Sequence, residues 1–431
     1  MDTLGFLHGL DWADIPAATQ SQVNLSLLDL IGVGLGGATT RANQITRDYV
    51  SVQNADHRPM LFDARTASAW GVAHAGTATI AALDGHDGFN PAMGHAGAAA
   101  FPTAFAMAHE AGNRNGADLL TTLTLGYEFG WRLATALHAT TPDYHTSGAW
   151  MAVACAGLGA RYLRLDPDIT RHAMGIAEDH RPRSQMMRCN QHEEAEHVGG
   201  EAPQMAGGAA AFLAQAGFTG APALTLEQAP DHWADLGTRW LVNQQYYKPY
   251  PACRWAQAPI EGVLHLRRAH GVTAQDVDRI EVETFHESVR LATAQPTSTD
   301  AAQYSTSFPC AVAMVKGNVT PADIADDALT DPEVLRLSRG MVMAEHVTAN
   351  AVFPITRLTR THLILRDGTV LQGDWIEPKW DTTCPPSEAD LRAKFRNLAG
   401  AQATAIEDAV DALPTTGVGR LSALLAQPIS P

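Results

Sequence analysis

The stretch Ala117–His138, ADLLTTLTLGYEFGWRLATALH, decides the character of the first half of the fold. It is a long, largely apolar segment rich in small residues, which predicts a helix. Ser147–Leu165 is likewise apolar and rich in small residues, and similar segments broken by Gly and Pro run from about Ser21 to about Gly220. Small residues let helices approach one another closely, so we expect a tightly packed helical domain.

The pattern of apolar and polar residues changes after Gln257. Arg279–Phe285, RIEVETF, alternates with period two, and Leu363–Leu371, LILRDGTVL, predicts two strands around an Asp-Gly turn. Ser387–Leu425 returns to an amphipathic helical pattern. We therefore expect a mostly α protein: a large helical domain, residues 1–255 completed by residues 395–431, and a smaller α/β domain, residues 256–394.

Composition narrows the functional class. The chain has 431 residues, 45% of them hydrophobic, and a formal charge of −16. That charge argues against nucleic acid and against anionic membrane, which both need clustered Lys and Arg. The start of the chain lacks the basic and apolar segments of a signal peptide, and no apolar run is long enough to span a bilayer. We expect a soluble, cytoplasmic protein.

The cysteines indicate reduced thiols. Their number is odd and none has CxxC spacing, which fits neither a disulfide framework nor a structural zinc site. They are Cys155, Cys189, Cys253, Cys310 and Cys384.

Two motifs resemble cofactor or metal sites and are better explained otherwise. Gly32–Gly37 matches GxGxxG, but the preceding Val23–Ile31 fits a buried helix rather than the strand that a dinucleotide site needs. We therefore expect close packing at a helix end. His192–His197, HEEAEH, has one residue more than HExxH, which places the two histidines about 140° apart around a helix. A loop that joins them with Cys189 is the alternative.

Tyr247–Arg254, YKPYPACR, is the strongest candidate for chemistry. It sets Lys248 between aromatic rings and prolines that restrict the backbone. A desolvated lysine has a lowered pKa and can bind a carboxylate or carry a proton. The alternative is a solvated lysine in a Pro-rich turn.

Polar residues in small, apolar surroundings form a second candidate. Asp84–Asp87, DGHD, and His95 lie between predicted helices, and Tyr144–Gly148, YHTSG, opens another. Its hydroxyls are candidate N-caps, and an anion at that helix end would place His145 as a general acid or base. The alternative for each histidine is a core or capping role.

Five segments, in order and spacing, resemble the MmgE/PrpD family over nearly the whole chain. They are Gly126–Glu128, His145–Gly148, Lys248–Cys253, Ala302–Phe308 and Pro378–Asp381. The family includes 2-methylcitrate dehydratase, cis-aconitate decarboxylase and iminodisuccinate epimerase. The resemblance implies a large all-helical domain completed by the C-terminal helix, an α/β lid domain, a homodimer, and neither metal nor organic cofactor.

The resemblance also implies the site residues. The positions matching the family's acidic cluster, its two histidines and its late lysine would be catalytic: Asp84, Asp87, His95, His145 and Lys248. Those expected to bind substrate are His86, Tyr144, Glu194, His197, Arg254, Tyr304 and Thr306. Further arginines that could hold an anion are Arg181, Arg183 and Arg188.

The chain departs from the family pattern at three places. Asp84–Asp87 stands for an Asp-Phe-Asp-Asp-like run, with one residue inserted before His95. Glu194 stands where a lysine is expected, and Gln257 where a histidine is expected. A carboxylate at the lysine position would repel an anionic substrate, so we expect a substrate other than 2-methylcitrate.

The family's reactions begin with proton removal next to a carboxylate. We therefore expect a lyase of the dehydratase type acting on a small carboxylate-bearing metabolite. An isomerase that epimerises such an acid is the alternative, because its first step is the same. A tailoring enzyme for a larger, less charged metabolite is a third reading. Glu194 and the tryptophans Trp233, Trp240 and Trp255 would suit it, although core positions are commoner for tryptophan. A non-catalytic binding protein is the fourth reading.

Overall fold

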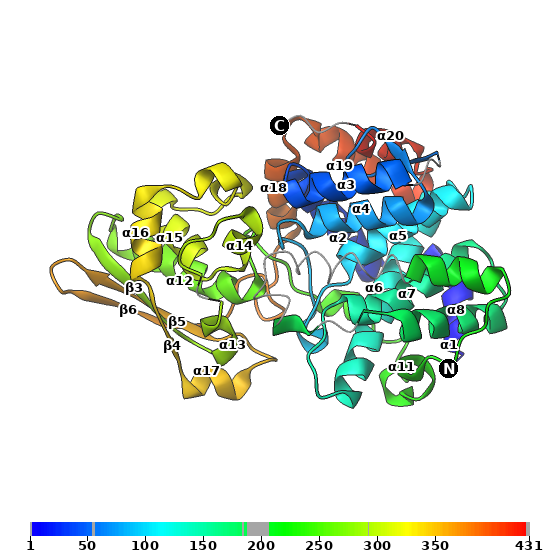
Figure 1. Cartoon of the computed structure of the whole chain (residues 1–431), viewed down its shortest axis with the longest axis horizontal. Helices are drawn as coiled ribbons and strands as arrows, with labels where there is room; N and C mark the ends of the chain where they lie inside the picture. Colours follow the sequence, from blue (N-terminus) through cyan, green and yellow to red (C-terminus); the bar gives the residue numbers. More distant parts are fainter. Residues whose placement is uncertain (1, 54–56, 183–184, 188–206, 292, 428–431) are drawn as a thin grey trace.

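The chain forms two lobes side by side, as Figure 1 shows. The computed structural model describes residues 2–53, 57–182, 185–187, 207–291 and 293–427. The helical lobe holds both ends of the described chain, and the sheet lobe runs from α12 to β6. A mostly helical fold with a smaller, sheet-containing lobe confirms the expected fold class.

The helical lobe is built from closely packed helices. Helices α4, α5, α6 and α7 pack in succession, and α2 packs against α4, α5 and α6. The approach between α5 and α6 requires glycine, since a Cβ on Gly126 would lie 2.5 Å from Ala100 Cβ. The elements are α1 (Thr3–Gly9), α2 (Ala17–Gly37), α3 (Arg41–Gln53), β1 (Arg58–Pro59), β2 (Thr66–Ala67), α4 (Ala69–Ala81), η2 (Asn90–Ala92), α5 (Gly97–Glu110), α6 (Gly116–Thr140), α7 (Gly148–Tyr162), α8 (Pro167–His180) and α11 (Leu224–Glu227).

The glycine-rich motif lies within a helix. Gly32–Gly37 forms the last turns of α2, as the apolar run before it predicts. A Cβ on Gly34 would lie 2.4 Å from Phe62 Cζ. The motif therefore serves close packing, which confirms our preference over a dinucleotide site. Within the described ranges no single helix is long and apolar enough to cross a membrane, and α2 with α3 passes only as a pair bent by 97°.

The sheet lobe is a four-stranded mixed sheet with helices on one face. The strand order is β4-β3-β5-β6; β3 and β4 are parallel and the other pairs antiparallel. Helix α12 packs on β5 and β6, and α16 on β3, with α15 against both helices. The elements are α12 (Arg254–His270), β3 (Val277–Thr284), α13 (His286–Val289), α14 (Thr299–Tyr304), α15 (Ser307–Lys316), α16 (Pro332–Gly340), β4 (Val342–Glu345), α17 (Val347–Val352), β5 (Thr359–Leu365) and β6 (Val370–Ile376).

The two predicted strand segments are confirmed. Arg279–Phe285 falls on β3 and its end, and Leu363–Leu371 spans the β5–β6 hairpin. Gly368 in the predicted Asp-Gly turn has φ +88°, a conformation that favours glycine.

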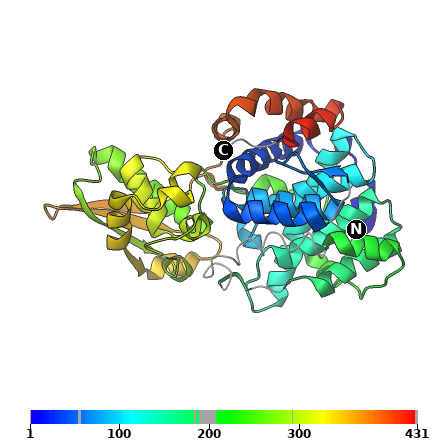
Figure 2. The ribbon, with the colours of Figure 1, turned by 45° about the horizontal axis from the view of Figure 1, so that its top comes forward.

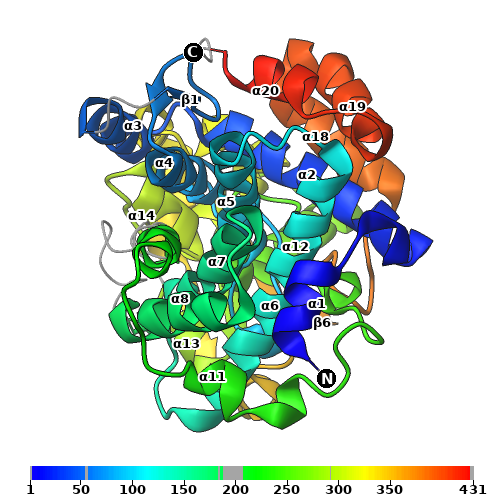
Figure 3. The ribbon, with the colours of Figure 1, turned by 90° about the vertical axis from the view of Figure 1, so that its right-hand side faces the viewer.

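The C-terminal segment returns to the helical lobe as three helices rather than one. They are α18 (Glu388–Ala399), α19 (Ala403–Ala412) and α20 (Gly419–Leu425), and they lie together on the helical lobe beside α2, at the top of Figures 2 and 3. Helix α18 packs along α2, with the fully buried Phe395 against Gly32. The helical pattern breaks at Gly400, where φ is +55°.

Candidate active site

The candidate site lies where the loop between α4 and α5 meets the start of α12. Lys248 is completely buried, and its Nζ donates to both the backbone oxygen and Oδ1 of Asp84, each at 2.6 Å. The alternative of a solvated lysine is therefore wrong. Gln257 holds the lysine's loop, because its Nε2 donates to the carbonyls of Tyr250 and Ala252 at 3.1 and 2.8 Å.

Burial pushes this pair towards neutrality. It raises the pKa of Asp84 and lowers the pKa of Lys248, while the attraction between the two opposes both shifts. In place of water, the Lys248 ammonium has one carboxylate oxygen and one carbonyl oxygen as hydrogen-bond acceptors. Lys248 is consequently a better proton carrier than a lysine in water.

Two histidines face this pair in a defined tautomer. His95 Nδ1 and His86 Nδ1 lie 2.6 and 3.2 Å from the carbonyl oxygen of Asp87. A carbonyl only accepts, so each Nδ1 carries the proton and each Nε2 keeps its lone pair. The Nε2 atoms lie 3.5 Å (His95) and 3.9 Å (His86) from Asp84 Oδ1.

Both imidazoles are neutral at physiological pH. Burial lowers the pKa of His86 to about 3 and that of His95 well below its usual value, and the charge of Lys248 lowers both further. The side chain of His95 keeps 22% of its surface exposed, against 4% for His86. His95 is therefore the accessible base.

The same cluster was tested as a metal site. Within the described ranges, Asp84, His86 and His95 bring three ligand atoms within 4.8 Å of one another. The oxygen that a metal would use, Asp84 Oδ1, accepts the Lys248 ammonium instead. That positive charge repels a cation, so the cluster suits an ammonium–carboxylate pair better than a metal ion. The motif 192–197 and Cys189 lie outside the described residues.

The carboxyl group of Asp87 is held by residues of α5 and α6. It accepts from the Tyr127 hydroxyl at 2.6 Å and from the Gly97 amide at 3.3 Å. Burial raises the pKa of Asp87 to about 7. The side chain thereby joins the loop to α5 and α6, while its backbone carbonyl orients the two histidines. This geometry favours a positioning role for Asp87.

The start of α7 closes another side of the site. Ser147 stands at the N-cap position of α7, but its Oγ accepts the His95 amide at 2.9 Å and makes no capping hydrogen bond. The Tyr144 hydroxyl donates to the Met93 carbonyl at 2.6 Å. The buried His145 donates its amide to His138 Nε2 at 3.4 Å.

An arginine network continues from the start of α12. Arg254 forms an ion pair with Asp381, and its guanidinium lies 3.8 Å from the Tyr246 ring centroid. Asp381 also accepts from Asn90 Nδ2 at 3.0 Å, and Asn90 Oδ1 accepts from Arg357 Nη1 at 2.5 Å. Sequence reasoning missed Arg357, which precedes β5 and resembles an ordinary strand arginine.

A second missed residue approaches from the C-terminal helices. Lys394 on α18 donates to the Gly85 carbonyl at 2.7 Å and pairs with Asp29 Oδ1 at 2.7 Å. Gly85 follows Asp84 directly, so α18 fixes the loop that carries the acid. In an amphipathic pattern such a lysine is indistinguishable from one on a solvated face.

The other predicted residues are distributed around this centre. Thr306 is buried at the start of α15, and Tyr304 and Tyr144 pack against a cluster that contains Cys253. Arg181 pairs with Glu178 at 3.2 Å. Glu194, His197, Arg183 and Arg188 lie outside the described residues. The three tryptophans are buried core side chains: Trp233, Trp240 and Trp255.

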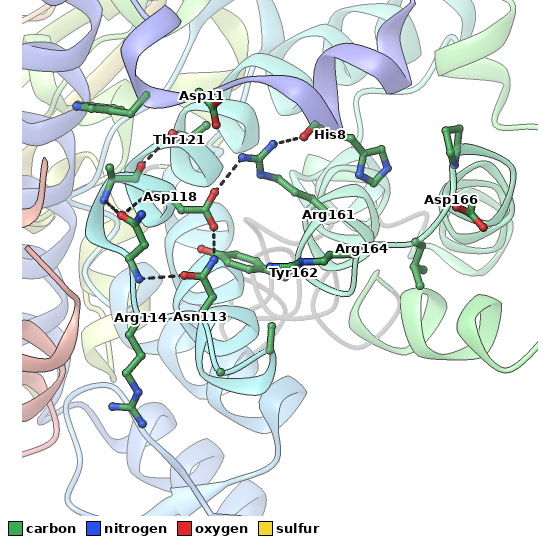
Figure 4. A pocket seen from close by; sticks show the side chains of 17 residues that line it. His8, Asp11, Asn113, Arg114, Asp118, Thr121, Arg161, Tyr162, Arg164 and Asp166 are labelled. Atoms are coloured by element: carbon green, nitrogen blue, oxygen red, sulfur yellow. Dashed lines mark hydrogen bonds and ion pairs between the residues drawn. The ribbon is translucent and has the colours of Figure 1, made fainter. Parts of the chain in front are cut away.

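A separate hollow of about 960 Å³ lies at the other end of α7 (Figure 4). Arg161 on its wall donates to the carbonyls of Leu7, His8 and Leu10 and pairs with Asp118 at 2.9 Å. Because α7 spans about 22 Å, this hollow is remote from His95. Its arginine joins α1 to α6 through both terminal nitrogens.

Comparison with known proteins agrees with the fold. The MmgE/PrpD N-terminal domain matches residues 3–234, and the MmgE/PrpD C-terminal domain matches residues 250–413. The cis-aconitate decarboxylase of Homo sapiens is 24% identical over 418 residues, which cover 90% of this chain and 85% of that protein. The resemblance in five sequence segments is thus confirmed over both domains. The chain belongs to the MmgE/PrpD family.

Proposed function

We propose that this protein is a lyase that removes a proton next to a carboxylate and then eliminates a leaving group. The observation that carries the proposal is the buried Lys248–Asp84 pair facing the unprotonated Nε2 of His95. A cation and a neutral base within one buried cluster are what α-proton removal requires.

The steps follow from this arrangement. His95 Nε2 takes the proton, and the electron pair of the C–H bond moves towards the carboxylate, where Lys248 stabilises the added charge. The pair then forms a C=C bond while the C–O bond to a leaving hydroxyl breaks. His145 supplies the proton with which that hydroxyl departs as water. The sequence of steps uses neither metal nor organic cofactor.

The substrate class is a small carboxylate-bearing metabolite. Family membership and the decarboxylase relative support this class. Glu194 at the expected lysine position argues against 2-methylcitrate. The tailoring-enzyme reading loses one of its two supports, because the tryptophans belong to the core, and it rests on Glu194 alone. A homodimer and a cytoplasmic location complete the proposal, and analytical ultracentrifugation tests the first.

Proton NMR in D₂O tests the reaction. The purified protein is incubated with hydroxy di- and tricarboxylates, cis-aconitate and iminodisuccinate. We expect a new olefinic signal, reduced roughly 10²-fold or more in Lys248→Met and in His95→Gln. Lys379→Met is the matched control, because Lys379 is half exposed and lies 3.9 Å from Glu261.

The outcomes are distinct. Deuterium incorporation without an olefin would make the enzyme an epimerase. An undiminished signal in Lys248→Met would remove the lysine from the mechanism. Silence of the wild-type protein across the whole panel would contradict the proposal and favour a binding function.

A further inference from the structure

Arg357 is a buried cation without a counter-charge. It is 3% exposed and lies in the loop before β5. Among the described residues its hydrogen-bond partner is the neutral Asn90 amide oxygen, and no carboxylate lies within ion-pair distance. Its Nε is buried without a partner. Its guanidinium carbon lies 5.9 Å from the Phe353 ring centroid.

The neighbouring cations are already neutralised. Lys248 is paired with Asp84, and Arg254 with Asp381. Asp381 accepts in addition from Asn90 and from the amide and hydroxyl of Thr382. Among the described residues, the acceptor that Arg357 contacts is therefore the neutral amide oxygen of Asn90. Lys248 and Arg254 thus each have a carboxylate partner within hydrogen-bond distance, whereas Arg357 has none in the described part of the chain.

Arg357 acts electrostatically on the catalytic groups. The pKa of His95 is lowered first by burial, and the charges of Lys248 and Arg357 add to that effect. Arg357 also contacts the segment that carries the catalytic groups, because its partner Asn90 lies between Asp84 and His95 in the chain. The guanidinium thus belongs to the same site, although it is contributed by the sheet lobe.

An unpaired charge in the interior is costly, and a protein keeps one where an anion completes it. A guanidinium offers a planar fork of donors that matches a carboxylate. With Nη1 engaged by Asn90, the Nε edge is the one left for a ligand.

We infer that Arg357 binds a second, non-reacting carboxylate of the substrate and is a specificity-determining residue. This inference rests on the proposed function, in which Lys248 binds the carboxylate next to the reacting carbon. The substrate then carries at least two carboxylates and contacts both lobes.

A binding experiment tests the inference without turnover. The probes are succinate, a dianion, and monomethyl succinate, which has one carboxylate; thermal unfolding of the full chain is followed as each is added. In the wild-type protein we expect succinate to raise Tm at lower concentration than its monoester. In Arg357→Met the succinate Kd should rise roughly 10- to 100-fold, to that of the monoester, with no loss of Tm in the ligand-free protein.

Arg360→Met is the matched control, because Arg360 lies three residues further along and pairs with Glu283. It should bind succinate as the wild type does. Arg357→Gln, which keeps a polar group for Asn90, replaces the methionine variant should that one fail to fold. The inference is overturned if neither Arg357 variant weakens succinate binding, if Arg360→Met weakens it equally, or if succinate does not stabilise the wild-type protein. A protein that binds succinate through Arg357 but catalyses nothing would contradict only the proposed function.

Discussion

Lys248→Met should convert a buried ion pair into a lone buried acid. The side chains of Lys248 and Asp84 are 0% and 4% exposed, and their charged atoms lie 2.6 Å apart. Breaking such a pair from one side costs about 3–5 kcal/mol of unfolding free energy, because the remaining charge has no partner. The double variant with Asp84→Asn should recover most of that loss, since it removes the charge as well.

The loss should depend on pH. Burial already raises the pKa of Asp84, and Lys248 opposes that rise, so removal of the lysine raises the pKa further. Between the unfolded pKa, about 4, and the higher folded pKa, the folded state binds one more proton. The free energy of unfolding therefore falls as pH rises, by about 1.4 kcal/mol per pH unit across that window.

Urea unfolding followed by circular dichroism at pH 5 and pH 8 measures this. The Lys248→Met midpoint should fall further below wild type at pH 8 than at pH 5, and the double variant should lack this difference. The exposed Lys379→Met should unfold with the wild type. Equal losses at both pH values, or a double variant as unstable as the single one, would refute the reasoning.

Three further predictions follow from other contacts. Lys394→Met should lower the free energy of unfolding by about 3–5 kcal/mol, because it leaves Asp29 buried and unpaired. A double variant with Asp29→Asn should regain stability to urea, and no recovery would contradict the pairing. Tyr127→Phe should lower the free energy of unfolding by about 1–3 kcal/mol. The loss should be larger at pH 8 than at pH 5, because the ionised Asp87 loses a hydrogen-bond donor. Tm measured at both pH values checks this, and an equal loss would contradict it. Gln257→Ala should lower Tm, because two backbone carbonyls of the loop that follows Lys248 lose their hydrogen-bond donor. Gln257→Glu keeps the size of the side chain but loses the donors, so it should also have a lower Tm than the wild type.

The sequence predicted the elements wherever local pattern and packing agree. The small-residue segments became α6 and α7, the alternating segment became β3, and the Asp-Gly pair became the β5–β6 turn. The spacing of hydrophobic residues and the residue types of turns are local properties, so the sequence alone predicts these elements. Lys248 was also identified in this way, because prolines and aromatic residues beside a lysine indicate a constrained loop.

The contacts that sequence reasoning did not foresee occur where a side chain had more than one partner available. Ser147 was expected to cap its own helix, but its hydroxyl accepts the amide of His95 from another segment. The catalytic role expected of Asp87 stays a prediction, and the structure adds that its carboxyl group accepts a hydrogen bond from Tyr127. Both contacts join residues 40 or more positions apart, and residue type alone does not choose between a local and a distant partner.

The sequence by itself determined the two-part helical and α/β organisation, the family, and the set of residues from which the site is drawn. Only the tertiary structure decided which of them face one another: that the carbonyl of Asp87 sets the tautomers of His86 and His95, that Lys394 from the C-terminal helix secures the acid's loop, and that Arg357 reaches the site without a counter-charge. Local patterns report how a segment buries its apolar face, whereas the charge and proton balance of a site depends on distances between segments that are remote in the chain.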